Sequence, residues 1–150
     1  MSDTNTRIAA QSADVILGPN PIVGFRVADV AREGARAIGL ALRQPRLTGS
    51  MARQVGSEWL KVFRGESDLQ PGKRDRRFAD PDWIDNPRYR MWLQAYLAWV
   101  NGVHGWIDAQ PDISKFSRAR LEFLSSLLND AIAPSNFPWQ PTALKKFKET

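Results

Sequence analysis

The sequence predicts an all-α protein: an irregular bundle of about four to five helices with a mobile N-terminal arm. Apolar residues recur at helical spacing through most of the chain, whereas the alternating pattern of a half-buried strand is nearly absent. Asx-Pro pairs precede two of the periodic stretches, and glycine or proline follows others, as at the starts and stops of helices. A chain of 150 residues is expected to form one such domain with one modest core.

The predicted elements begin after a small, polar stretch at residues 1–18, which has no period and is expected to be a mobile arm. Residues 19–150 are predicted to form the helical domain. The stretch from Val27 to Leu42 predicts an amphipathic cationic helix that ends before Pro45. Its polar side carries three arginines that form a candidate surface for a partner: Arg32, Arg36 and Arg43.

A second helix is predicted from about Thr48 to Arg64, with Gly65 as its stop. Residues 65–77 have no period and many turn formers, so we expect a loop there. Asp80 then precedes Pro81 as a candidate N-cap, followed by a single helical turn, and Asn86 precedes Pro87 in the same way.

The two remaining helices are the strongest elements of the sequence. One is predicted from Arg88 to about Asp108, and the other from Ser114 or Ser117 to Ala133, where Pro134 stops it. Two glycines inside the first of them, Gly102 and Gly105, each cost that helix ~1 kcal/mol relative to alanine.

Composition restricts the class of protein. Hydrophobic residues make up 43% of the chain and charged residues 25%, as in globular proteins. No apolar run approaches the ~20 residues of a transmembrane helix, and no secretory signal opens the chain, so we expect a cytoplasmic protein. The absence of cysteine excludes disulfides, thiolate metal sites and a cysteine nucleophile.

Charge is distributed unevenly around a net value of +5. Residues 19–77 hold twelve Lys and Arg against six Asp and Glu, whereas residues 78–114 hold two against five. A basic first half suits an acidic partner, an anionic membrane face or nucleic acid. The alternative is a solvated arginine-rich face that only keeps the protein in solution.

The sequence contains no combination of residues that is typical of a catalytic site. The single histidine, His104, lies inside the long predicted helix, where such a residue is more often packed or half-exposed than a general base. Asp80, Asp82 and Asp85 are close in sequence, but their Asx-Pro context favours caps over metal ligands. We therefore predict no catalytic residue, no metal site and no cofactor.

Aromatic residues along the long helix are the clearest candidates for a function. Trp92, Trp99 and Trp106 follow one another at seven-residue intervals and form one slowly turning ridge, with Tyr89 and Tyr96 on an adjoining stripe. Such a wide apolar arc indicates a helix that is central in its own bundle or packed on two sides. The ridge is thus either ordinary core or a docking surface for another domain, an apolar polymer or a lipid.

Several segments resemble the N-terminal domain of poly(3-hydroxyalkanoate) polymerases, in order and spacing as well as residue type. Three lie in the middle of the chain: Asp75-Arg76-Arg77-Phe78-Ala79-Asp80-Pro81-Asp82-Trp83, Asn86-Pro87-Arg88-Tyr89 and Tyr96-Leu97-Ala98-Trp99. Two more lie toward its ends: Asn20-Pro21-Ile22-Val23-Gly24-Phe25-Arg26 and Ala133-Pro134-Ser135-Asn136-Phe137. The resemblance covers residues 19–150. Gln140-Pro141 stands where the family pattern has Asn-Pro, so the synthase subclass and its preferred monomer stay open.

The resemblance implies an enzyme that joins 3-hydroxyacyl units from coenzyme A thioesters into polyester on cytoplasmic granules. In that family the Cys, Asp and His of catalysis belong to a following α/β-hydrolase domain, so we expect this chain to be truncated at its C-terminal end and inactive alone. The family's N-terminal domain is associated with granule binding, dimerisation and contact with granule-associated proteins. The implied partners are thus a catalytic domain in cis or in trans, the granule surface or its proteins, and a second copy.

A rival interpretation needs no polymerase. It is a free-standing basic helical module that binds anionic lipid or, less expectedly, nucleic acid.

Overall fold

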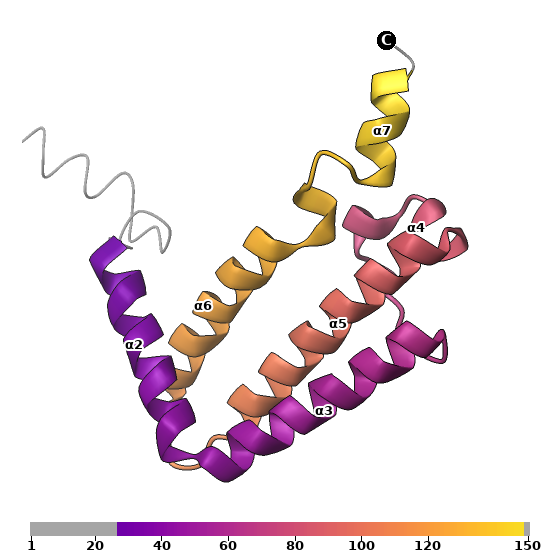
Figure 1. Cartoon of the computed structure of the whole chain (residues 1–150). Helices are drawn as coiled ribbons and strands as arrows, with labels where there is room; N and C mark the ends of the chain where they lie inside the picture. Colours follow the sequence, from indigo (N-terminus) through magenta and orange to yellow (C-terminus); the bar gives the residue numbers. More distant parts are fainter. Residues whose placement is uncertain (1–26, 149–150) are drawn as a thin grey trace, which may run out of the picture. The chain divides into compact units, whose positions relative to one another are not determined.

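The computed structural model describes residues 27–148, and all regular secondary structure in this range is helical (Figure 1). The elements follow in order: α2 (Val27–Arg43), α3 (Pro45–Arg64), η1 (Arg76–Phe78), α4 (Asp82–Asp85), α5 (Pro87–Asp108), α6 (Lys115–Ile132), η2 (Pro134–Asn136) and α7 (Pro141–Lys148). The predicted all-α class is confirmed. The predicted arm at residues 1–18 and the segment Asn20–Arg26 lie outside the described residues.

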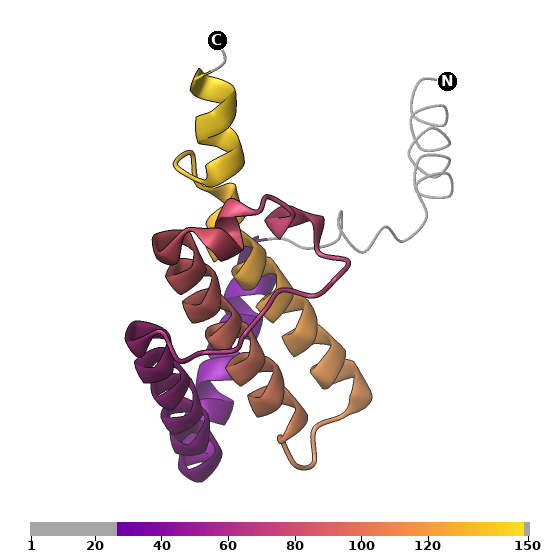
Figure 2. The same cartoon turned by 90° about the vertical axis from the view of Figure 1, so that its right-hand side faces the viewer.

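Two compact units divide the chain, and α2 crosses the boundary between Arg36 and Ala37. The packing described below lies within the second unit. There, α5 contacts α3, α4 and α6, and it lies between α3 and α6 in Figures 1 and 2. Of the two alternatives that the sequence left open for the long helix, the central position within its own bundle is the one that these contacts support.

Most helix boundaries lie within one residue of the predicted positions, two corrections concern prolines, and α7 was not predicted. Pro45 is the first residue of α3, so α3 begins three residues before the predicted Thr48. Proline suits this position because its missing N–H would have no partner in the first turn. Gly65 ends α3 with φ at 74°, in the left-handed region that favours glycine, as predicted.

The Asx-Pro pairs act as caps, and the second correction concerns the first of them. The Asp80 carboxylate accepts a hydrogen bond from the Asp82 backbone N–H at 3.1 Å, but α4 begins at Asp82, so Pro81 precedes the helix. The Asn86 side chain accepts from the Arg88 N–H at 3.0 Å and is the cap as predicted, while α5 opens at Pro87, one residue before the predicted start. Of the two serines considered for α6, Ser114 is the cap, since its hydroxyl accepts from the Ser117 N–H at 3.1 Å.

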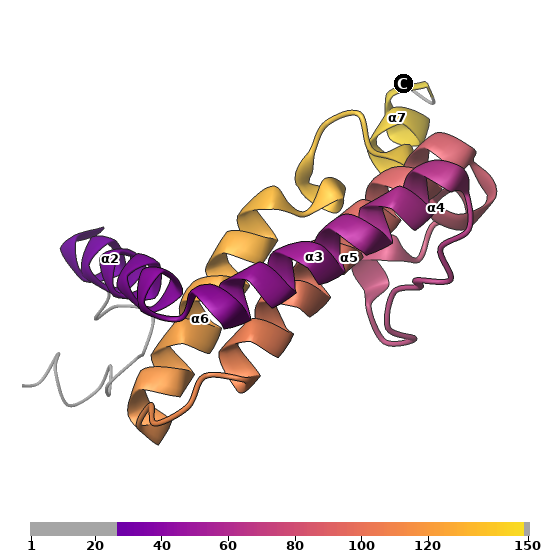
Figure 3. The ribbon, with the colours of Figure 1, turned by 60° about the horizontal axis from the view of Figure 1, so that its bottom comes forward.

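Gly102 explains how closely α3 and α5 approach each other. A Cβ atom at this position would lie 2.3 Å from Cγ2 of Val55 on α3, so only glycine fits without a shift. Figure 3 shows α3 running alongside α5. The loss of helix propensity at Gly102 is therefore offset by the close packing of α3 on α5. No such packing explains Gly105, because a Cβ atom there would meet nothing within 4 Å.

Candidate interaction surfaces

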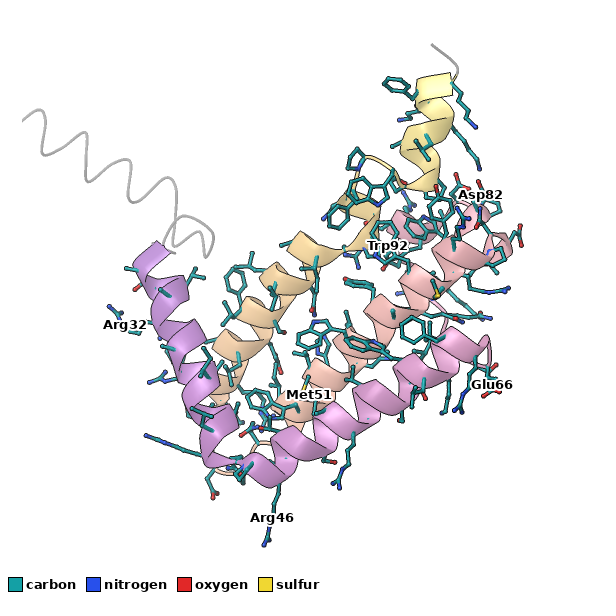
Figure 4. The ribbon with its side chains drawn as sticks, in the orientation of Figure 1. Arg32, Arg46, Met51, Glu66, Asp82 and Trp92 are labelled. Carbon is teal, nitrogen blue, oxygen red and sulfur yellow. The ribbon has the colours of Figure 1, made fainter. Side chains whose placement is uncertain are left out.

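An aromatic cluster fills the end of the fold where α4, the start of α5 and η2 meet. The indole of Trp83 is completely buried, and its ring lies 5.1 Å from that of Phe78, 5.5 Å from Tyr89 and 6.0 Å from Trp92. Trp92 stacks in turn on Trp139, with 6.2 Å between the rings. Figure 4 shows the Trp92 side chain at this end of α5.

Both tyrosines of the predicted stripe anchor this cluster to later parts of the chain. The Tyr89 hydroxyl donates to the Trp139 backbone carbonyl at 2.9 Å, and the buried Tyr96 hydroxyl donates to the Asn129 carbonyl at 3.2 Å. Burial raises the pKa of Tyr96. These residues hold α5 to α6 and to the segment after η2.

The other two tryptophans of the ridge have different surroundings. Trp106 donates its indole N–H to the Thr48 hydroxyl at 3.2 Å, and Thr48 donates to the Ala41 carbonyl at 2.9 Å. The indole nitrogen of Trp99 is buried and has no hydrogen-bond partner among the described residues. All three ridge tryptophans are half-buried. Each indole is therefore partly covered by the described fold and partly exposed to solvent. Contact of these tryptophans with another domain stays a prediction.

Charged residues of the segment that resembles the polymerases form a network with α6. The Arg77 guanidinium donates to both carboxylate oxygens of Asp75, at 2.9 and 2.8 Å, and to Asp130 at 2.8 Å. Hydrogen bonding from Arg77 lowers the pKa of Asp75, and the same contact raises the pKa of Arg77. The network ties the loop before η1 to α6, and Arg76 beside it is exposed.

A second charged group fastens α7 to α4. Lys145 lies 2.7 Å from the Asp80 carboxylate and 3.0 Å from that of Asp82, which Figure 4 labels near α7. The hydrogen bond from Lys145 lowers the pKa of Asp80. These aspartates therefore act as a cap and an ion-pair site, and within residues 27–148 no group of acidic or histidine side chains could hold a metal ion.

The Pro134-Ser135-Asn136 turn closes the aromatic end. Pro134 is fully buried, and the Asn136 side-chain amide donates to the Asp130 carbonyl. The Ser135 hydroxyl is buried with no hydrogen-bond partner in the described part of the chain.

The remaining candidates lie at the surface. His104 is exposed on α5, and Arg43 is exposed at the end of α2. Arg32 pairs with Asp29 at 3.1 Å, and Arg36 pairs with Glu33 at 3.6 Å, each one turn apart on α2. Half or more of each of these two arginine side chains remains exposed to solvent.

Sequence reasoning missed the exposed apolar side of α6. Its buried positions include Leu121, Ser125 and Asn129, whereas Phe116 is 68% exposed and Leu127 43% exposed. Two of these buried positions are thus polar, while large apolar side chains of the same helix face solvent. The broad apolar content of this segment was visible in the sequence, but only the neighbours of α6 determine which side is covered.

The described fold is that of a small helical domain organised around one central helix, and its candidate sites are surfaces rather than a catalytic centre. The family model described as poly-beta-hydroxybutyrate polymerase (PhaC) N-terminus matches residues 74–150. The chain belongs to this family.

Known relatives agree with this assignment. The chain is 37% identical over 146 residues to poly(3-hydroxyalkanoate) polymerase 1 of Ectopseudomonas oleovorans, a match that covers 97% of this chain and 26% of the relative. It is 40% identical over 127 residues to poly(3-hydroxyalkanoate) polymerase 2 of the same organism, covering 85% and 22% of the two chains. The chain therefore spans about a quarter of the length of these relatives. No solved structure matches it with significant similarity.

The described helices were compared in length and apolar character with what a membrane span requires. Among the described helices, none combines the length and the apolar character that crossing a bilayer requires.

Proposed function

We propose that this chain is the N-terminal accessory domain of a polyhydroxyalkanoate synthase, an acyltransferase that polymerises 3-hydroxyacyl-CoA. It packs on a catalytic α/β-hydrolase domain, in cis or in trans, and helps to place that domain at polyester granules in the cytoplasm. Family membership supports this role, as does the presence of the same region within polymerases about four times as long. Dimerisation and contact with granule-associated proteins belong to the same proposal.

The observation that carries the docking role is the outward side of α6. Phe116 and Leu127 are exposed there and project within about 20° of each other around the helix axis. Ser125 and Asn129 occupy buried positions on the opposite side of the same helix. Exposed apolar residues gathered on one side of a helix mark a surface that another apolar surface covers. We assign this side of α6 to the catalytic domain.

The predicted ridge then has a supporting role in this proposal. The contacts of four ridge and stripe residues hold α5 to its neighbours within the described fold: Tyr89, Trp92, Tyr96 and Trp106. Of these, Tyr96 is bonded to α6 and Trp106 to α3. Contact of the half-buried ridge tryptophans Trp92, Trp99 and Trp106 with a catalytic domain stays a prediction.

The test combines Phe116→Gln with Leu127→Gln and measures binding to a separately supplied polymerase catalytic domain. Both side chains are exposed, so circular dichroism should show intact helices. Burying one large apolar side chain is worth about 1.5–3 kcal/mol, so binding should weaken by at least roughly tenfold. Ser126→Gln, at an exposed polar position of α6, is the matched control and should bind normally. Unchanged binding by the double variant would remove α6 from the docking surface.

A further inference from the structure

The helix α3 presents an apolar flank to solvent beside the side that packs on α5. Val55 and Val62 are buried, whereas Leu60 is 56% exposed and Phe63 is 68% exposed. The rim of the flank is Trp59, whose indole N–H donates to the Ala95 carbonyl of α5 at 3.0 Å. The flank is therefore a fixed part of the folded bundle, because the same helix is held to α5 along its other side.

Three arginines run along α3 next to this flank. Arg46, Arg53 and Arg64 are separated by 7 and 11 residues, which correspond to about two and three helical turns, so they lie in one row. Figure 4 shows Arg46 pointing away from the bundle. All three are exposed, and the ion pairs found in residues 27–148 include none of them.

Lys61, on the same helix, differs from the three arginines because it forms an ion pair. Its ammonium lies 2.6 Å from the carboxylate of Glu58, the one acidic residue of α3. The four cations of α3 against one acid leave an excess of three positive charges, and these are carried by the arginine row. The row therefore lacks local compensation and suits a partner with several negative charges.

The apolar flank and the arginine row lie edge to edge. At about 100° per residue, Leu60 projects within about 20° of Arg53 around the helix axis. The 20 residues of α3 extend for about 30 Å. An occupant must thus offer an apolar layer and, directly beside it, negative charges along the whole helix.

An anionic lipid surface has this layered structure, with acyl chains below and phosphates above. Helices with Trp, Phe and Leu on one side and arginines beside them lie in that boundary. Nucleic acid supplies phosphates but no apolar layer for Leu60 and Phe63. A protein partner would need acidic groups that match the spacing of the arginines, whereas mobile headgroups meet each arginine without such matching.

We propose that α3 docks this chain on an anionic phospholipid surface, with Leu60 and Phe63 at the acyl boundary and Arg46, Arg53 and Arg64 on the headgroups. This inference deepens the granule part of the proposed function and rests on it for where such a surface occurs. It does not involve α6, and α3 lies outside the residues that the family model matches.

The experiment measures binding of the 150-residue chain to vesicles of phosphatidylcholine alone and of phosphatidylcholine mixed with phosphatidylglycerol. Strong binding is expected only to the mixed vesicles, and added salt should weaken it. Arg46→Gln, Arg53→Gln and Arg64→Gln together should weaken binding roughly 100-fold, since each arginine near such a surface contributes about fivefold. Leu60→Gln with Phe63→Gln should weaken it at least roughly tenfold.

A matched charge control removes three other exposed cations: Lys73→Gln, Arg74→Gln and Lys115→Gln. Vesicle binding should survive in this variant. Equal losses in both triple variants would mean that net charge decides binding, and equal binding to neutral vesicles would remove the arginine row from the mechanism. Either result overturns the proposal.

Binding to the catalytic domain separates this proposal from the docking role of α6. The arginine variant should retain that binding while it loses the vesicles. The Phe116 and Leu127 variant should do the opposite. If the arginine variant loses the catalytic domain and keeps the vesicles, α3 is a protein interface and the lipid proposal fails.

Discussion

The two halves of α5 are packed in opposite ways. The first half packs two of its own rings on Trp83 of α4, with ring centroids 5.5 Å apart for Tyr89 and 6.0 Å apart for Trp92. The second half is approached by α3 so closely that Gly102 has no room for a side chain. Trp92 and Trp106 share one seven-residue repeat, yet one stacks on rings and the other donates to a hydroxyl. The spacing of a repeat thus places residues on a helix face, while the neighbouring elements determine their roles.

The largest expected loss of stability comes from a substitution in the aromatic cluster around the first half of α5. Trp83→Ala removes a completely buried indole that contacts Phe78, Tyr89 and Trp92. We expect the free energy of unfolding to fall by about 3–5 kcal/mol, measured by urea denaturation with circular dichroism. Trp139→Ala at the exposed rim of the same cluster should cost much less. Equal losses in the two variants would mean that Trp83 is not the centre of this half.

The close contact in the other half is tested by a pair of glycines on the same helix. Gly102→Ala places a Cβ 2.3 Å from Val55, so we expect a loss of about 1–3 kcal/mol in the free energy of unfolding. Gly105→Ala meets nothing within 4 Å and should stabilise the fold by about 0.4–1 kcal/mol. Thermal melting of both variants provides the measurement. Stabilisation by both alanines would contradict the close approach of α3.

Local signals in the sequence predicted much of this fold. Pro87 after Asn86, Ser114 before α6 and Gly65 after α3 each act through bonds or backbone angles within a few residues, so their roles can be inferred without the fold. At Pro45 and Pro81 the predicted boundary differed because proline can end one helix and precede or open the next.

Other features depend on residues that are distant in sequence. The contact between Lys145 and Asp80 joins positions 65 residues apart. The need for glycine at position 102 is explained only by the nearby side chain of Val55 on α3. The broad apolar content of α6 is visible in its sequence, but the exposure of Phe116 and Leu127 is not, since exposure is set by what packs nearby. Surfaces that bind partners are therefore the part of this protein that periodicity predicts least.

A smaller effect sharpens the contrast between two ridge tryptophans in the second half of α5. Trp106→Phe removes an indole N–H that is bonded to Thr48, whereas Trp99→Phe removes one that is buried without a partner among the described residues. Each substitution removes similar volume, so the difference between them isolates the hydrogen bond. We expect Trp106→Phe to cost about 0.5–1.5 kcal/mol more in chemical denaturation. A greater cost for Trp99→Phe would indicate that its N–H is bonded after all.

The smallest expected effect distinguishes the two ends of α5 by their response to acid. At the aromatic end, Asp75 has its pKa lowered by the hydrogen bonds from Arg77. A carboxylate whose folded pKa lies below its unfolded value of about 3.9 contributes stability above that pH, and this contribution disappears as pH falls through the folded pKa. At the other end, Arg118 donates to the Ile107 and Gln110 carbonyls, which do not titrate.

Acid should therefore weaken the aromatic end first. Asp75→Asn should lower the free energy of unfolding at neutral pH by no more than about 1 kcal/mol, because the pair with Arg77 is partly exposed and screened by solvent. The stability curves of the variant and the wild type should converge below about pH 4, where the wild-type carboxylate becomes protonated. Asp108→Asn is the control at the other end, since this carboxylate is 75% exposed and 3.8 Å from Arg118, and it should leave the acid dependence unchanged. Parallel curves for Asp75→Asn and the wild type down to low pH would show that the Asp75 pair does not stabilise the fold through its charge.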